Sequence, residues 1–356
     1  MKYKVRDLLQ IKNGKDYKKI KKGNYPVFGS GGVITYIEEF LYNHESILLP
    51  RKGSLNNIMY VNEPFWTVDT MYWTKINNNI VLPKYLYFYL KLMDISTRSS
   101  GTTLPSMTFD AYYNINVHIP NIKVQKNVLN LLNMIDDKIE INNKINDNLN
   151  NQIKLIYKFW FNNSKNKETY KLVPFSKVAD WESNSQPPKK DFIYEPKKNY
   201  IRFIQNRDYF NDSHKTYIPY SKKLKIVTKL DIMMDKYGDA GRTRYGLEGA
   251  FNVALGKIVV KNELYREYIR SFLEDEKIYK YLNNSSLAST RASLSESNLS
   301  NLLIPFFGED KTYIFGKISQ KIRLQILQNK EFNECLMKIK DFIAPLLING
   351  QAEIDD

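Results

Sequence analysis

The sequence predicts an α+β fold in which two globular domains alternate with two long helices. The helices are expected to pair as an antiparallel coiled coil, and the two halves of the chain to form an internal pseudo-two-fold repeat. Three observations predict this fold. The 356-residue chain exceeds what one hydrophobic core usually organises, similar segments recur at a fixed offset, and each half ends in a heptad pattern. We place the globules at residues 1–120 and 164–306, the helices at 121–163 and 307–350, and a tail at 351–356.

Two pairs of segments carry the repeat. Ile47–Gly53, ILLPRKG, is similar to Ile232–Gly238, IMMDKYG, which lies 185 positions further along the chain. Ser106–Pro120, SMTFDAYYNINVHIP, pairs with Arg291–Pro305, RASLSESNLSNLLIP, at the same offset of 185. The same frame pairs two further positions, Trp66 with Phe251 and Val68 with Val253. Several matches at one offset indicate an internal duplication.

Each copy ends in a helical stretch whose apolar residues alternate in steps of four and three, the spacing of a coiled-coil seam. The first seam runs through Val128, Leu132, Ile135, Ile139, Asn142, Asn146, Leu149, Ile153, Ile156 and Trp160. The second seam, 187 positions further, runs through Phe315, Ser319, Ile322, Ile326, Asn329, Asn333, Leu336, Lys340, Ile343 and Leu347.

Asparagines interrupt both seams near the middle, where Asn142 and Asn146 correspond to Asn329 and Asn333. A buried asparagine layer lowers stability but penalises slipped registers. We therefore predict that these four residues set the register of an antiparallel helix pair. The alternative is that they mark the frayed, exposed ends of helices in an asparagine-rich protein.

The charge of the chain favours a polyanionic partner. Lysine and arginine outnumber aspartate and glutamate by 53 to 38, which gives a net charge of +15 and a pI near 9.4. Membrane-surface binding would need a basic amphipathic anchor, whereas the seams here suit partner helices. The alternative is a basic surface that binds no partner. In that case the codon bias of an AT-rich genome would account for the many lysines.

Composition and the N-terminus limit the other classes of protein. A single cysteine, Cys335, excludes an internal disulfide, and with three histidines it leaves too few ligands for a zinc site. No apolar run approaches the roughly 18 residues of a membrane span. Arg6 and Asp7 lie where a signal peptide needs an apolar core, so we expect a cytoplasmic protein with no metal and no membrane contact.

Catalytic motifs are not found in the sequence. Gly256–Lys257 lacks the rest of a phosphate-binding loop, and no Asn-Pro-Pro-aromatic string of the amino-methyltransferases occurs. Asp180, Glu195 and Lys197 could be combined into a nuclease active site. Pro196 argues against such a site, because it would break the strand that the site needs. His118, paired with Leu303 by the offset of 185, is expected to be a packed strand residue and not a general base. We therefore predict no catalytic residues.

Basic residues beside glycines are the better candidates for function. Arg51 and Lys52 precede Gly53, and Lys236 precedes GDAGRTRYG, which contains Arg242 and Arg244. Small neighbours let a backbone approach DNA closely, and arginine offers paired donors that match the O6 and N7 atoms of guanine. A solvated surface charge is the alternative for each of these residues taken singly. Weaker candidates for phosphate or base contact are Thr102, Thr103 and Arg291.

The order of these segments resembles the specificity subunits of type I restriction-modification systems. The first half carries YPVFGSGG at Tyr25–Gly32, ILLPRKGS at Ile47–Ser54, and SGTTLPSM at Ser100–Met107. The second half carries the weaker IMMDKYGDAGR and SSLASTRASLSESNLSNLLIP. One departure is the absence of the acidic-glutamine pair that often follows the proline at the start of each helix. Because this pair is absent, the residue at which each long helix begins is not defined by the resemblance.

The resemblance implies two target-recognition domains that read double-stranded DNA, held apart by the helices. It also implies two methyltransferase subunits and restriction and translocase subunits as partners, with S-adenosylmethionine, ATP and Mg²⁺ bound by those partners and no cofactor in this chain. Ser30 and Ser54 join the predicted DNA-binding residues on this basis. A helix of about 35 residues is roughly 50 Å long, so we expect half-sites on the order of 10 to 15 base pairs apart.

Two other interpretations remain open. The chain could be a helix-mediated interaction protein whose globules bind proteins, in which case binding would depend weakly on salt, whereas DNA binding weakens steeply as salt rises. It could also be the recognition half of a fused restriction and methylation enzyme. A neighbouring methyltransferase gene would favour the multi-subunit interpretation.

Overall fold

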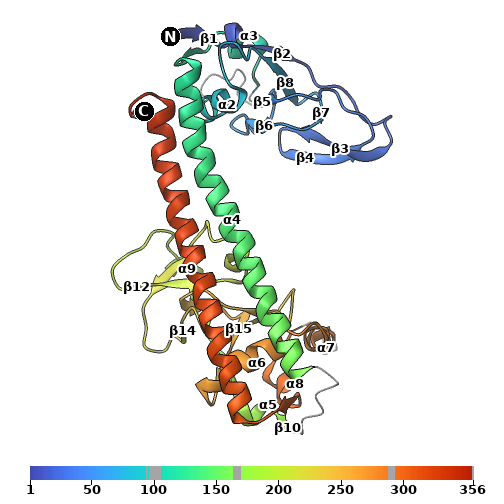
Figure 1. The fold of residues 1–356 in the computed structure, drawn as a ribbon, viewed down its shortest axis with the longest axis vertical. Coiled ribbons are helices and arrows are strands. Elements are labelled where there is room, and N and C mark those ends of the chain that lie inside the picture. Colours follow the sequence, from blue (N-terminus) through green and yellow to red (C-terminus); the bar gives the residue numbers. More distant parts are fainter. Residues whose placement is uncertain (94, 96–105, 163–169, 288–292, 355–356) are drawn as a thin grey trace. The chain divides into compact units, whose positions relative to one another are not determined.

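The computed structural model describes residues 1–93, 95, 106–162, 170–287 and 293–354 (Figure 1). The chain divides into two compact units, which we call unit 1 (Met1–Ile141 and Phe332–Asp356) and unit 2 (Asn142–Glu331). Each unit holds one globule and one half of each long helix. Within the described residues, no helix is long and apolar enough to cross a membrane.

The globule of unit 1 is built on two larger sheets and one short strand pair. The antiparallel sheet β2-β8-β5-β6 consists of Leu9–Lys12, Met71–Ile76, Ser46–Pro50 and Met59–Val61. The sheet β4-β3-β7 consists of Gly32–Ile37, Lys22–Gly29 and Trp66–Thr67, with β3 and β7 parallel. Strand β1 (Lys2–Lys4) pairs with β9 (Asn116–His118). Strand β5 is buried along its whole length, as its apolar run requires.

Three short helices cover the core of unit 1. They are α1 (Val5–Leu8), α2 (Pro83–Leu92) and α3 (Phe109–Tyr113). Proline at the first position of α2 has the backbone angle that a helix start needs, and Thr108 caps α3 by accepting a hydrogen bond from the Ala111 amide. The fully buried side chain of Gln125 bonds to Leu82 N, Ile80 O and Pro120 O, which fixes the start of the next long helix.

Unit 2 repeats this order of elements. Its antiparallel sheet β11-β18-β15-β16 consists of Ala179–Ser183, Leu255–Val260, Ile232–Asp235 and Thr243–Arg244. Its second sheet, β13-β12-β17-β14, consists of Tyr217–Pro219, Tyr200–Ile204, Gly249–Phe251 and Ile226–Val227, with β12 and β17 parallel. Strand β10 (Lys171–Pro174) pairs with β19 (Leu303–Phe306). The short α-helices are α5 (Phe175–Val178), α6 (Arg266–Leu273), α7 (Glu276–Leu287) and α8 (Glu296–Ser300), and the 3₁₀ turns are η2 (Lys189–Asp191), η3 (Asn206–Tyr209) and η4 (Glu263–Tyr265).

The long helices are α4 (Ile122–Phe161) and α9 (Glu309–Ile348), each 40 residues long, and their halves run antiparallel within each unit. In unit 1, Lys340 forms an ion pair with Asp136, and Asn333 donates to the carbonyl of Ile139. In unit 2, Asn329 Nδ2 donates to Asn146 Oδ1 at 2.8 Å. None of the predicted seam residues is exposed. The predicted α+β fold, with repeated globules and paired long helices, is therefore confirmed.

Three of the four predicted register residues, Asn142, Asn146 and Asn333, are at most 6% exposed, and Asn329 is half-buried. They lie inside the seams and not at frayed helix ends. The domain boundaries 1–120, 164–306 and 351–356 stay a prediction. The elements nearest to these boundaries are β9, α4, β10, β19 and α9, within the bounds given above.

The duplication is real, but the constant offset of 185 is wrong outside β5 and the turn that directly follows it. Equivalent backbone bonds, Met71 N to Val68 O and Leu255 N to Asn252 O, put the offset at 184 in this region, so Trp66 is not the counterpart of Phe251. Near β9 the offset is 187, because Val5 N donates to Ile115 O as Phe175 N donates to Leu302 O. Loops of different length between the elements shift the frame.

The pairing of Ser106–Pro120 with Arg291–Pro305 was therefore two residues out of register. The similar endings HIP and LIP of these segments do not occupy equivalent positions. Asn116 lies opposite Lys4 in the first strand pair, and Leu303 lies opposite Pro174 in the second. The counterpart of His118 is therefore Pro305 and not Leu303. His118 lies on strand β9 but is exposed, so the expectation that it is packed is also wrong.

Candidate DNA interface

A basic turn follows the buried strand β5 in unit 1, and the backbone holds it from two sides. Arg51 N donates to Thr70 O at 2.9 Å, and Met107 N donates to Arg51 O at 2.9 Å. Gly53 then adopts a φ of +85°, a conformation that favours glycine. We call Arg51–Gly53 the first anchored turn.

Ser30 lies against this turn. A side chain added at Gly53 would place its Cβ 2.9 Å from Ser30 Oγ, so the two segments are close. The Asn57 side-chain amide donates to Ser30 O at 2.7 Å and ties the tip of the β3–β4 hairpin to the loop after β5. The structure thus gathers four predicted residues in one place: Ser30, Arg51, Lys52 and Ser54.

The cations of the first anchored turn are available to a partner. Lys52 and Ser54 are exposed, and Arg51 is half-buried. Among the residues that the structure describes, neither Arg51 nor Lys52 forms an ion pair. The positive charge of the turn is therefore not neutralised by a neighbouring carboxylate within the described part of the chain.

Unit 2 holds an equivalent turn after β15. Lys236 N donates to Ala254 O at 2.9 Å, Leu294 N donates to Lys236 O at 2.9 Å, and Gly238 has a φ of +73°. These are the counterparts of the bonds and of the glycine in unit 1. We call Lys236–Gly238 the second anchored turn. The half-burial of Lys236 lowers the pKa of its ammonium group.

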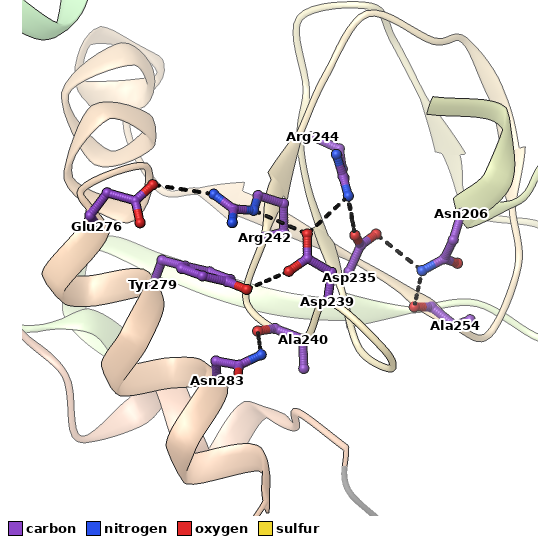
Figure 2. A network of polar contacts seen from close by, with 10 residues as sticks. All are labelled: Asn206, Asp235, Asp239, Ala240, Arg242, Arg244, Ala254, Glu276, Tyr279 and Asn283. Carbon is purple, nitrogen blue, oxygen red and sulfur yellow. Dashed lines mark hydrogen bonds and ion pairs between the residues drawn. The ribbon is translucent and has the colours of Figure 1, made fainter. Parts of the chain in front are cut away.

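Arg242 and Arg244, predicted to contact DNA, are engaged inside unit 2 (Figure 2). Arg244 donates twice to Asp235 Oδ2, at 3.0 and 2.8 Å, and lies 4.5 Å from the ring centroid of Phe210. Arg242 donates to Asp239 at 3.1 Å and stacks on Tyr279, with 3.7 Å to the ring centroid. Both arginines therefore brace the loop that begins at the second anchored turn.

The carboxylates of this network differ in environment. Burial raises the pKa of Asp235, and the hydrogen bond from Arg244 only partly offsets the rise. Burial also tends to raise the pKa of Asp239, but hydrogen bonds from Tyr279 and Arg242 bring that pKa below its ordinary value. Asn206 adds a further donor, with its Nδ2 3.0 Å from Asp235 Oδ1.

Three predicted residues, Thr102, Thr103 and Arg291, lie outside the described residues. The bracing role of Asp235 and Asp239 was missed, although both precede the arginines by less than ten positions and are visible in the sequence. Tyr279 and Asn206 come from distant segments, and no sequence signal identifies them. No group of histidine, cysteine or acidic residues suited to a metal ion occurs in the described ranges.

Replacing Arg244 by alanine is expected to lower the free energy of unfolding by about 3 kcal/mol, because it leaves the buried Asp235 without its cationic partner. The matched change Arg242→Ala is expected to lower it by at most about 1 kcal/mol, since that side chain is 36% exposed and its ion pairs are at the surface. Urea unfolding of the full chain measures both. Equal losses for the two variants would contradict the difference in role.

The fold and the two anchored turns define a class of protein: a duplicated chain in which each globule presents one basic turn and helices join the globules. The sequence matches the type I restriction modification DNA specificity domain twice, over residues 1–151 and 165–336. This chain belongs to that family. The resemblance drawn from the sequence is thereby confirmed.

Individual relatives agree with this assignment. The chain is similar to the type I restriction enzyme HindI specificity subunit of Haemophilus influenzae, with 33% identity over 91 residues, which cover 24% of this chain and 20% of that protein. It is also similar to the type I restriction enzyme MjaIX specificity subunit of Methanocaldococcus jannaschii, with 22% identity over 351 residues, covering 87% and 78%. The crystal structure of a type I restriction-modification S subunit from M. genitalium has the same fold, with a TM-score of 0.62, 16% identity and coverage of 100% and 96%.

Proposed function

We propose that this chain is the DNA sequence-recognition subunit of a type I restriction-modification complex and that each globule reads one half of a bipartite site. The observation that carries the proposal is the duplication of the anchored turn, with the same backbone bonds and a basic residue at the same position in both units. A net charge of +15 supports a polyanionic partner. The chain makes and breaks no bonds itself.

The paired helices serve as the spacer between the half-sites. A helix of 40 residues is about 60 Å long at 1.5 Å per residue. Half-sites on the order of 10 to 15 base pairs apart, centre to centre, are compatible with such a spacer. The asparagines within the seams keep this spacer at one length.

The partners in this proposal are two methyltransferase subunits, together with restriction and translocase subunits. Large apolar side chains on the outer faces of the helices support docking of partner helices. On α4, Met134 and Ile141 of unit 1 are 67% and 50% exposed, and Leu155 and Phe159 of unit 2 are 65% and 64% exposed. S-adenosylmethionine, ATP and Mg²⁺ belong to the partners.

An exchange of the second globule tests the function. Residues 162–308, the segment between α4 and α9, are replaced by the same segment of a family member with another specificity. Cells expressing the hybrid with its methyltransferase subunit are expected to methylate a motif with one half changed and the other half kept. Sequencing of the methylated bases measures the motif. The reciprocal exchange of residues 1–121 is the control, and a continuous motif, or a change in both halves, would overturn the proposal.

A further inference from the structure

The second anchored turn presents a residue that the charge pattern does not single out. Because the backbone bonds of the two turns are equivalent, Lys236 is the counterpart of Arg51 and Tyr237 is the counterpart of Lys52. Each of the two positions is followed by a glycine with positive φ. Tyr237 thus occupies the position at which unit 1 presents an exposed cation.

Tyr237 is free to meet a ligand. Its side chain is 46% exposed and forms no hydrogen bond or ring contact within the described part of unit 2. Next to it, a Cβ placed on Gly238 would find no atom within 4 Å. Among the described residues, the turn therefore faces open space on this side, and none of them supplies a partner for the aromatic ring.

The network beneath the turn keeps it in place. Asp235 N donates to Arg242 O at 3.0 Å, and Gly241 N donates to Asp235 O at 2.9 Å, which closes the loop. Arg244 and Arg242 neutralise the carboxylates on either side of the turn, Asp235 and Asp239 (Figure 2). A loop that is already ordered loses less conformational entropy when it binds.

We infer that Tyr237 contacts the bases of the second half-site and helps to determine its sequence, while Arg244 acts as a positioning residue beneath the turn. The inference rests on the proposed function. A phenol ring offers an apolar surface for the methyl group of thymine and a hydroxyl for a base edge, whereas the cations of the first turn suit guanine and phosphate. The two half-sites are then read by different chemistry from equivalent positions.

The test is Tyr237→Ala in the full chain, expressed with its methyltransferase subunit. The methylated motif is expected to keep its first half and to become degenerate at one or more positions of the second. Binding of the purified complex to the wild-type motif is expected to weaken about 5- to 150-fold, since one base contact contributes about 1 to 3 kcal/mol. The unfolding midpoint should stay unchanged, because the side chain is exposed.

Matched variants sharpen the result. Tyr237→Phe keeps the ring and should keep most of the sequence preference in the second half of the methylated motif. Lys52→Ala should change the sequence preference in the first half alone. Binding that weakens equally on all sequences with an unchanged motif would overturn the base contact, as would an unchanged motif with unchanged affinity. A wild-type chain that directs no bipartite methylation would instead contradict the proposed function, so the two failures are distinguishable.

Discussion

Replacing Arg323 by alanine is expected to lower the free energy of unfolding of unit 2 by about 3 to 5 kcal/mol, the largest single-residue effect we predict. Arg323 lies on α9 and is only 2% exposed. Its guanidinium donates to Glu267 and to Glu274, both at 2.7 Å, and so joins the long helix to α6. The variant leaves Glu267, itself 2% exposed, as a buried carboxylate with weaker partners.

Two matched changes make the Arg323 experiment specific. Lys321→Ala removes an exposed cation from the same helix and should change stability by less than about 0.5 kcal/mol. Arg323→Lys keeps the charge but not the forked pair of donors, so its loss of stability should lie between those of Arg323→Ala and Lys321→Ala. Chemical unfolding followed by circular dichroism measures all three. If Arg323→Ala unfolded at the same denaturant concentration as Lys321→Ala, the network would not be structural.

Unit 1 has no equivalent of this network among its described residues. The position on α4 that corresponds to Arg323, 187 residues earlier, is Asp136, whose ion pair with Lys340 leaves its side chain 41% exposed. Removing Asp136 should therefore affect stability far less than removing Arg323. The duplication has kept the backbone and the helix pairing, while the polar contacts between helix and globule have diverged.

The helices were predictable because a periodic pattern within one segment is enough to define them. The predicted seam side chains, from Val128 to Trp160 and from Phe315 to Leu347, are all buried or half-buried. The offset of 185 was less secure, because each insertion in a loop changes it. Only the hydrogen-bond pattern, which the sequence does not contain, identified the counterparts of Ile115 and His118.

The candidate site was predictable where one short segment defines it. Arg51 and Lys236 follow buried strands and precede glycines, so their placement in turns could be read from the sequence. Arg242 and Arg244 were expected to face DNA, which stays a prediction. Their ion pairs show that a basic residue in a glycine-rich segment can serve the loop itself. Whether such a basic residue contacts DNA or stabilises its own loop depends on partners from other elements, such as Tyr279, which the local sequence does not identify.

The asparagine layer gives the second large effect, this time on the spacing of the half-sites. Asn146 is 5% exposed and accepts one hydrogen bond from Asn329, while its own amide nitrogen has no partner among the described residues. Replacing both residues by leucine removes this unsatisfied group, so we expect the free energy of unfolding to rise by about 2 kcal/mol. The same change removes the penalty on slipped registers. Cells carrying the double variant should therefore methylate motifs with more than one spacer length.

Single variants separate the two consequences of the asparagine layer. Asn329→Leu alone leaves Asn146 Oδ1 buried without its donor and should lower stability by about 1 to 3 kcal/mol, the opposite sign to the double variant. Asn148→Leu makes the same chemical change at an exposed position of α4 and should alter neither stability nor spacing. If the double variant gained stability but kept a single spacer length, the apolar seam alone would fix the register. The asparagines would then lower stability without contributing to the spacing.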